Sequence, residues 1–132
     1  HSFCIVMAQK TVRKPTASEL NLLKVLWPLG QATVKQAHEA AQKENPDIAY
    51  ASVLRLMQIM HGKGLLTRDE TERSHVYAPA QAQGAIRTNL LNELINKAFS
   101  GSGKELVMAA LKEHVSQKER DEIQKILRGE TP

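Results

Sequence analysis

The stretch AYASVLRLMQIMHGKGLLTRDETERSHVYAP, residues 49–79, decides the fold that this chain is expected to adopt. Apolar residues recur at helical spacing from Tyr50 to His61, and this pattern stops at the Gly-Lys-Gly sequence that follows. An alternation of apolar and polar residues begins at Leu65, is interrupted by a charged turn, and resumes at residues 75–77. The stretch therefore predicts a helix that leads directly into a two-stranded hairpin.

A helix that begins at Thr16 is expected ahead of this stretch. Thr16 is followed three positions later by Glu19, which is the spacing of a capping box, and apolar residues then recur at helical spacing up to Trp27. Pro28 together with Gly30 is expected to end the helix. Trp27 could stack on a ligand or belong to the core, and its place on an apolar helical face favours the core.

A second helix is expected from its cap at Thr33 to about Glu44, before the turn sequence Asn-Pro-Asp. The third helix would turn four apolar side chains inward: Val53, Leu54, Met57 and Met60. Three short helices and a hairpin within residues 16–80 are the order of a winged helix-turn-helix domain. In that fold the third helix fits a DNA major groove and the hairpin, or wing, lies along the neighbouring backbone.

Residues 81–132 carry a different pattern, that of three helices separated by a Gly-Ser-Gly break and by a capping serine, Ser116. Their apolar stripe is wide for helices surrounded by water, yet they have too few bulky residues for an independent globule of roughly 50 residues. Pairing with a second copy of the chain is the simplest way to bury the stripe, and folding back on residues 16–80 is the alternative. The residues expected at the dimer contact are Leu90, Leu91, Leu94, Ile95, Phe99, Leu106, Val107, Ala110, Leu111, Ile123, Ile126 and Leu127.

The expected organisation is a basic arm over residues 1–15, a winged-helix DNA-binding domain over 16–80 and a helical dimerisation domain over 81–132. The formal net charge is +4, and the first 80 residues hold 10 Lys and Arg against 7 Asp and Glu, the remainder 8 against 7. A basic first part suits contact with DNA, and a near-neutral second part suits self-association. The arm could touch phosphates or be a disordered end. Met7 is a candidate natural start, which would make residues 1–6 a non-native extension.

Several functional classes find no support in the residue pattern. Cys4 is the single cysteine, which excludes an intrachain disulfide and a multi-cysteine metal site and is compatible with a reducing cytoplasm. The histidines lack ligand-like spacing, and no glycine-rich phosphate loop or Ser/His/Asp context occurs, so we expect no metal, no cofactor and no enzymatic activity. No run approaches the roughly 18 apolar residues of a membrane span, so no membrane insertion is expected.

The residues expected to contact double-stranded DNA lie mainly on the third helix. Arg55 can form a bidentate pair with guanine, and Gln58 can bond adenine. Arg73 at the expected hairpin tip, with Lys63 and Arg68, would contact phosphate, although Lys63 could instead complement the helix dipole. The full expected set, which includes the start of the second helix as a phosphate site, is Thr33, Lys35, Tyr50, Ala51, Ser52, Arg55, Gln58, Lys63, Arg68 and Arg73.

These residues give the chain a resemblance to a known family, the penicillinase-repressor family of bacterial winged-helix transcription factors. The resembling segments are TASELNLLKVLWPLGQATVKQAHEA (16–40), AYASVLRLMQIMHGKGLLTRD (49–69) and RSHVYAP (73–79), with weaker matches at 92–113 and 116–127. The specific part is a combination: a first helix ending in tryptophan, a third helix ending in Lys-Gly, and a wing ending in Val-Tyr.

The resemblance implies a cytoplasmic homodimer that binds a near-palindromic operator and represses transcription. Half-sites would then lie about one helical turn, ~34–36 Å, or a multiple of that apart. By match to the family's motif, the DNA-facing positions are Tyr50, Ala51, Ser52, Arg55 and Arg73.

Three departures from the family pattern change what the resemblance implies. Members released by a membrane sensor-protease pathway are cut at an Asn-Phe bond in the C-terminal helical region, and the corresponding place here is Ala109-Ala110, which leaves a regulatory protease as an open question. Copper-responsive members carry cysteine pairs near the C-terminus, and this chain has none there. Ile59 stands where many relatives have arginine, and Arg55 where a smaller polar residue is common, so a different operator is expected.

Two other functions are compatible with the pattern. A winged-helix adaptor that binds another protein would show little salt dependence, whereas phosphate contacts make affinity fall steeply with ionic strength. A non-specific DNA-binding protein would bind random duplex as tightly as any chosen site.

Overall fold

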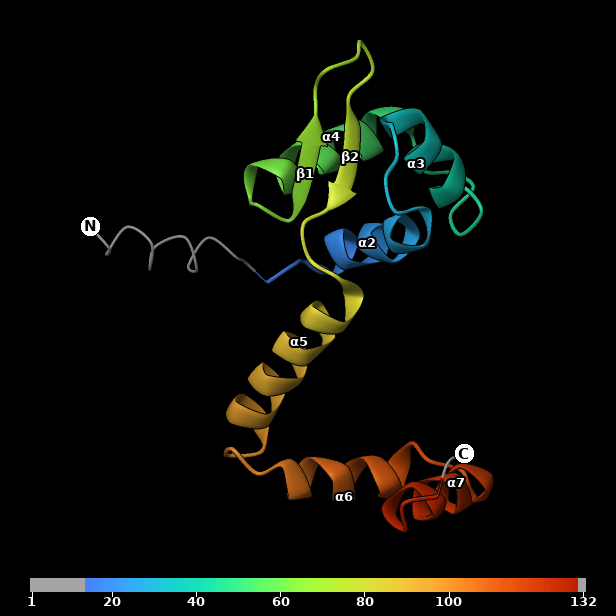
Figure 1. The fold of residues 1–132 in the computed structure, drawn as a ribbon, viewed down its shortest axis with the longest axis vertical. Helices are drawn as coiled ribbons and strands as arrows, with labels where there is room; N and C mark the ends of the chain where they lie inside the picture. Colours follow the sequence, from blue (N-terminus) through green and yellow to red (C-terminus); the bar gives the residue numbers. More distant parts are fainter. Residues whose placement is uncertain (1–13, 131–132) are drawn as a thin grey trace, which may run out of the picture. The chain divides into compact units, whose positions relative to one another are not determined.

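The computed structural model describes residues 14–130, so the expectations for the basic arm before Lys14 and for residues 1–6 lie outside the described residues. The chain divides into two compact units, His1–Arg87 and Thr88–Pro132. The first holds three helices, a hairpin and the start of a fourth helix, and the second holds the rest of that helix and two more (Figure 1). This order confirms the predicted winged helix-turn-helix followed by three helices. The functional boundary after residue 80 stays a prediction.

Helix α2 (Ala17–Leu29) begins at the predicted capping box. The Thr16 hydroxyl accepts a hydrogen bond from the Glu19 amide at 3.2 Å, and the Glu19 carboxylate accepts one from the Thr16 amide at 2.9 Å. Two backbone donors that the helix leaves without partners are thereby satisfied.

The end of α2 lies where the sequence placed it. The predicted end at Pro28 and Gly30 is confirmed, with Pro28 inside the last turn and Leu29 as the last helical residue. A proline this close to the end removes one backbone hydrogen bond and disturbs little helix beyond it. Gly30 ends α2 with a φ of 78°, a conformation that residues with side chains rarely adopt.

Helices α3 (Val34–Ala41) and α4 (Tyr50–Gly62) form the helix-turn-helix pair. α3 ends three residues earlier than predicted, because residues 42–44 form a turn in which the amides of Lys43 and Glu44 donate to carbonyls three residues back. Pro46 follows closely and disfavours helical backbone at the residue before it.

The wing is an antiparallel hairpin of β1 (Leu66–Asp69) and β2 (Val76–Pro79), joined by residues 70–75. The backbone of Tyr77 also exchanges two 2.8 Å hydrogen bonds with Ala32, which lies between α2 and α3. This bridge ties the hairpin to the helices. Figure 1 shows the loop of the hairpin extending away from the helices of the first unit.

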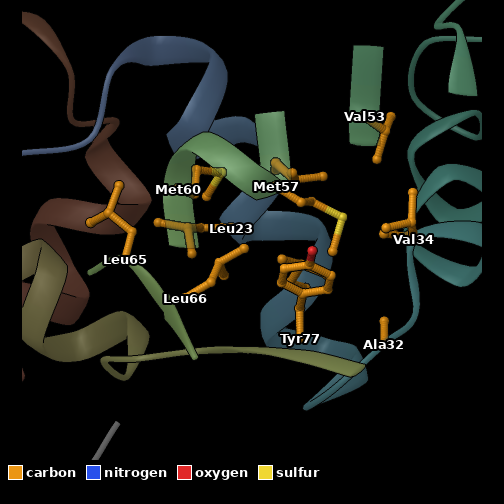
Figure 2. Packing of buried hydrophobic residues seen from close by; sticks show 12 residues of the cluster. Leu23, Ala32, Val34, Val53, Met57, Met60, Leu65, Leu66 and Tyr77 are labelled. Carbon is orange, nitrogen blue, oxygen red and sulfur yellow. The ribbon is translucent and has the colours of Figure 1, made fainter. Parts of the chain in front are cut away.

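The core of the first unit forms where the three helices and the hairpin meet, and Figure 2 shows Tyr77 beside Met57 in this cluster. Val53, Met57 and Met60 are fully buried as predicted, whereas Leu54 is only partly buried. Full burial of an apolar side chain of this size contributes roughly 1.5–3 kcal/mol. The buried cluster comprises Leu22, Leu23, Leu26, Ala32, Val34, Ala37, Val53, Met57, Met60, Leu65, Leu66 and Tyr77.

The second unit is built from the later part of α5 (Gln83–Ala98), α6 (Gly103–Glu113) and α7 (Gln117–Leu127). Ser100 and Gly101 take positive φ values of 50° and 83° and interrupt the helix between α5 and α6, as the Gly-Ser-Gly pattern predicted. The predicted capping box at the start of α7 is also present.

Burial differs sharply between the two units. Among described residues 88–130, every side chain is exposed or partly exposed and none is buried. Ile86, near the start of α5, is buried but belongs to the first unit. Within the described part of the chain, no helix is both long enough and apolar enough to cross a membrane.

Candidate nucleic-acid interface

Helix α4 has one buried face and one exposed face. Val53, Met57 and Met60 lie three or four residues apart and have no exposed surface, so residues on the opposite side of the helix point outward. Arg55 lies near the centre of the outward side, and Ile59, one turn later, is 43% exposed. The other predicted contact residues of this helix are also exposed: Tyr50, Ala51, Ser52 and Gln58. The core therefore orients α4 with its candidate base-contacting residues at the surface.

The beginning of α4 is held by His38 of α3. The Nε2 atom of His38 lies 2.9 Å from the carbonyl oxygen of Ile48, in the turn before α4. The His38 ring also meets the Tyr50 ring edge-on, with centroids 5.6 Å apart. The residue pattern gave His38 no role, since Ile48 and Tyr50 both lie ten or more positions further along the chain. The structure makes His38 a brace for the first turn of α4.

The N-termini of α3 and α4 use their first amides differently. The Thr33 hydroxyl accepts from the Gln36 amide, and the Thr33 amide donates to the Gln36 side chain, at 3.2 and 2.9 Å. Ala49, the N-cap residue of α4, makes no such side-chain hydrogen bond. The start of α4 is thus the better placed of the two to offer amides to an outside acceptor such as a phosphate oxygen. The predicted phosphate contact by Thr33 would compete with its capping box.

Three of the cations predicted to contact DNA have no carboxylate partner within residues 14–130. Lys35 on α3, Arg55 on α4 and Arg73 in the wing loop are all exposed. The planar guanidinium of Arg55 can present two parallel donors to a guanine edge. Arg73 directly follows Glu72 in the sequence, and Glu70 lies three positions before it; these carboxylate charges lower the positive potential of the wing loop.

Lys63, by contrast, has an intramolecular partner. Its ammonium nitrogen lies 2.8 Å from both carboxylate oxygens of Glu19, a residue that is 2% exposed. Burial by itself raises the pKa of Glu19, but the hydrogen bonds from Lys63 and Thr16 outweigh this effect and hold the pKa below its ordinary value. A phosphate contact by Lys63 would have to compete with this ion pair.

Arg68 is engaged within the wing. Its Nε atom donates to Glu70 at 2.6 Å, and its guanidinium carbon lies 5.9 Å from the centre of the Tyr77 ring, the residue opposite it in the hairpin. The Tyr77 ring also meets His61 of α4 edge-on at 6.3 Å. These contacts connect the hairpin to the end of α4, and they leave Arg68 less free than Arg73 to contact phosphate.

The helices of the second unit carry an exposed apolar face. Of the residues predicted at the dimer contact, five are between 44% and 79% exposed: Leu91, Leu94, Val107, Ile126 and Leu127. The remaining seven are partly exposed: Leu90, Ile95, Phe99, Leu106, Ala110, Leu111 and Ile123. Met108 on α6 is another exposed apolar residue, at 56%, and the sequence analysis did not include it.

Ala109 and Ala110, the pair that the family resemblance puts at the cleavage position, lie inside α6 and are partly exposed. Across residues 14–130, no three His, Cys, Asp or Glu side chains come together as a metal ion would require. The described residues thus offer helix amides and exposed cations, which suit an anionic polymer, and a separate apolar face.

Comparison with known proteins gives three findings. The family described as penicillinase repressor matches residues 15–129. Proteins named Transcriptional regulator BlaI from two strains of Mycobacterium tuberculosis are 26% identical over 95 residues, which are 72% of this chain and 68% of the relative. A solved structure concerned with the regulation of DNA binding of Bordetella bronchiseptica BpsR by 6-hydroxynicotinic acid shares 20% identity and a TM-score of 0.45, covering 92% of this chain and 80% of that one.

Proposed function

The chain belongs to the penicillinase repressor family, whose members are transcriptional regulators and not enzymes, and from this premise we propose that it is a homodimer that represses transcription from a near-palindromic operator. In this proposal α4 enters the major groove of each half-site, and the helices of the second unit join the two copies. Half-sites then lie about one helical turn, ~34–36 Å, or a multiple of that apart.

The observation that carries the DNA-binding part is the outward face of α4. Arg55 is exposed there and has no carboxylate partner in the described part of the chain, while Val53 and Met57 on the other side of the helix are fully buried. A helix fixed in this way presents a constant set of donors and apolar groups to a groove. The first amides of α4, with no side-chain cap from Ala49, add a place for phosphate at the same end.

The dimer part of the proposal is supported by the apolar face of α5, α6 and α7. Leu94 and Leu127 are 48% and 79% exposed. Removing such apolar surface from water is favourable by roughly 25 cal/mol for each Å². A second copy of the same face would cover them, since homodimer contacts are richer in apolar residues than the rest of a protein surface.

Selection of duplexes from a random pool, followed by fluorescence anisotropy at several salt concentrations, tests the proposal. We expect enrichment of an inverted repeat, tighter binding to it than to random duplex, and an affinity that falls steeply as salt rises. Equal affinity for random duplex would favour a non-specific DNA-binding protein. A failure to bind any duplex would favour the protein-interaction adaptor.

With chromosomal DNA as its partner, the protein is placed by this proposal in the bacterial cytoplasm. We do not expect proteolysis to release repression, because Ala109-Ala110 replaces the bond that is cut in some members of the family. Incubation with a sensor protease from such a system, followed by mass spectrometry, would reveal a cut in α6 if that route were retained.

A further inference from the structure

A buried ion pair joins the start of the first helix to the end of the helix proposed to read DNA. Glu19 lies in the first turn of α2, and Lys63 is the C-cap residue of α4, 44 positions later in the chain. The Lys63 ammonium lies 2.8 Å from both oxygens of the Glu19 carboxylate, whose side chain is 3% exposed. It is therefore a contact between two elements that the sequence keeps far apart.

The two partners of this ion pair differ in their access to water. The Lys63 side chain is 22% exposed and could turn toward water, whereas Glu19 is enclosed by the first unit. A buried carboxylate without a cation is strongly unfavourable, so the enclosed partner keeps Lys63 in place. The same carboxylate accepts a 2.9 Å hydrogen bond from the Thr16 amide, so its own position is fixed by the capping box of α2.

We propose that Glu19, acting through Lys63, is a positioning residue for operator recognition that fixes where the C-terminal end of α4 lies against α2. The pair completes a set of anchors along α4: His38 braces its first turn, the apolar core holds its middle, and Glu19 holds its end. The orientation of Arg55 and Ile59 toward bases then depends on a residue that touches no DNA. This inference rests on the proposed function.

The geometry argues against the simpler role of Lys63 as a phosphate contact. An ammonium already bound by both oxygens of one carboxylate has its charge largely neutralised, and leaving that site would strand Glu19. Lys63 also directly precedes Gly64 and the wing, so its displacement would disturb the connection to β1.

Glu19→Gln tests the proposal cleanly, because glutamine can still accept the Thr16 amide bond of the capping box but cannot balance the Lys63 charge. Operator affinity and its dependence on salt are measured for each variant at a temperature well below its thermal unfolding midpoint. We expect Glu19→Gln and Lys63→Met each to weaken operator binding by at least about fivefold. The double variant should bind the operator no more weakly than the weaker-binding single variant, because both substitutions remove the same ion pair.

Two further variants serve as controls. Lys63→Arg keeps a cation that can pair with the carboxylate and should bind close to wild type. Glu130→Gln makes the same chemical change in the exposed pair between Arg128 and Glu130, where both side chains are more than half exposed, and should leave operator binding unchanged.

Contrary results are distinct. If Lys63→Met lowered the salt slope by about 0.9 while Glu19→Gln bound as wild type, Lys63 would be a direct phosphate contact and the proposal would be overturned. It would also be overturned if both variants were less stable yet bound the operator with wild-type affinity, since the pair would then be purely structural.

An NMR comparison separates this inference from the proposed function. In ¹H–¹⁵N spectra without DNA, Glu19→Gln should shift the amides of Arg55 and Ile59 in α4. Unchanged shifts there would overturn the positioning role. If the wild-type protein bound no specific duplex while those amides did shift, the proposed function would fail and the coupling of Glu19 to α4 would stand.

Discussion

The indole nitrogen of Trp27 donates a 2.9 Å hydrogen bond to the carbonyl oxygen of Gln81. Trp27 lies near the end of α2, and Gln81 lies in the short segment between β2 and α5, so the bond fastens the chain as it leaves the wing. The ring is partly buried against the core, which agrees with the core placement that the sequence favoured. A buried indole usually needs such a partner, since its N–H otherwise loses its bond to water.

Trp27→Phe removes this hydrogen bond and keeps an aromatic ring. We expect the free energy of unfolding to fall by about 1–3 kcal/mol, from the lost bond and the smaller buried surface. Urea titration followed by circular dichroism measures it, because the variant lacks the chain's single tryptophan for fluorescence. A loss no greater than that of an exposed α2 substitution, such as Lys24→Ala, would show that the bond contributes nothing.

Arg55→Ala should weaken binding to the selected operator by about 1–3 kcal/mol and relax preference at one position of the half-site. The guanidinium is exposed and pairs with no carboxylate of residues 14–130, so the fold should be unaffected. Anisotropy with operator and random duplex measures both effects. Lys35→Ala is the matched control and should lower the affinity for both duplexes equally. If Arg55→Ala also lowered both affinities equally, Arg55 would not take part in base recognition.

Ile59→Arg places on α4 the residue that many relatives carry. Since Ile59 is 43% exposed, the change should alter the free energy of unfolding by no more than about 0.5 kcal/mol. We expect a different preferred sequence, because an apolar contact with a thymine methyl would be exchanged for donors that favour guanine. Duplex selection with both proteins measures this. Identical selected sequences would place Ile59 outside the groove.

Leu94→Glu introduces a charge into the exposed apolar face of α5. If that face joins two copies, the variant should sediment as a monomer and bind the operator far more weakly, because the half-sites are no longer linked. Asn96→Glu, at an exposed polar position of the same helix, is the control and should stay paired. An unaltered sedimentation coefficient for Leu94→Glu would place the contact elsewhere.

Acid should remove the contribution of Glu19 to stability. Its pKa in the folded protein is lowered from 4.5, so the unfolded chain takes up the proton first as pH falls. The contribution is therefore present above about pH 4.5 and is lost as pH falls through the lower folded value. Unfolding free energies at several pH values should show wild type and Glu19→Gln converging in acid. A constant difference would mean that Glu19 does not titrate in this way.

Much of the fold could be predicted because the deciding patterns are local. The capping boxes that begin α2 and α7 need only residues three apart, and the inward positions Val53, Met57 and Met60 follow from helical spacing. The end of α2 could be predicted for the same reason, because a proline and a glycine two residues apart are a local stop signal.

The candidate site could be predicted less completely, because its supporting contacts join distant residues. Lys63 looked free in the sequence, and only the folded chain brings Glu19 to it across 44 positions. His38 likewise acquires its role from the turn that returns the chain to Tyr50. Exposure of Arg55 was predictable from spacing, whereas which cations already have partners depends on packing.

Because residues 88–130 bury no side chain among the parts described, a lone copy gains little by holding these helices together. Their order would then come from association, and association depends on abundance. Under the proposed function, dilution during growth would by itself dissociate the dimers and release the operators. The rate at which the cell makes this protein would then help to set the level of repression.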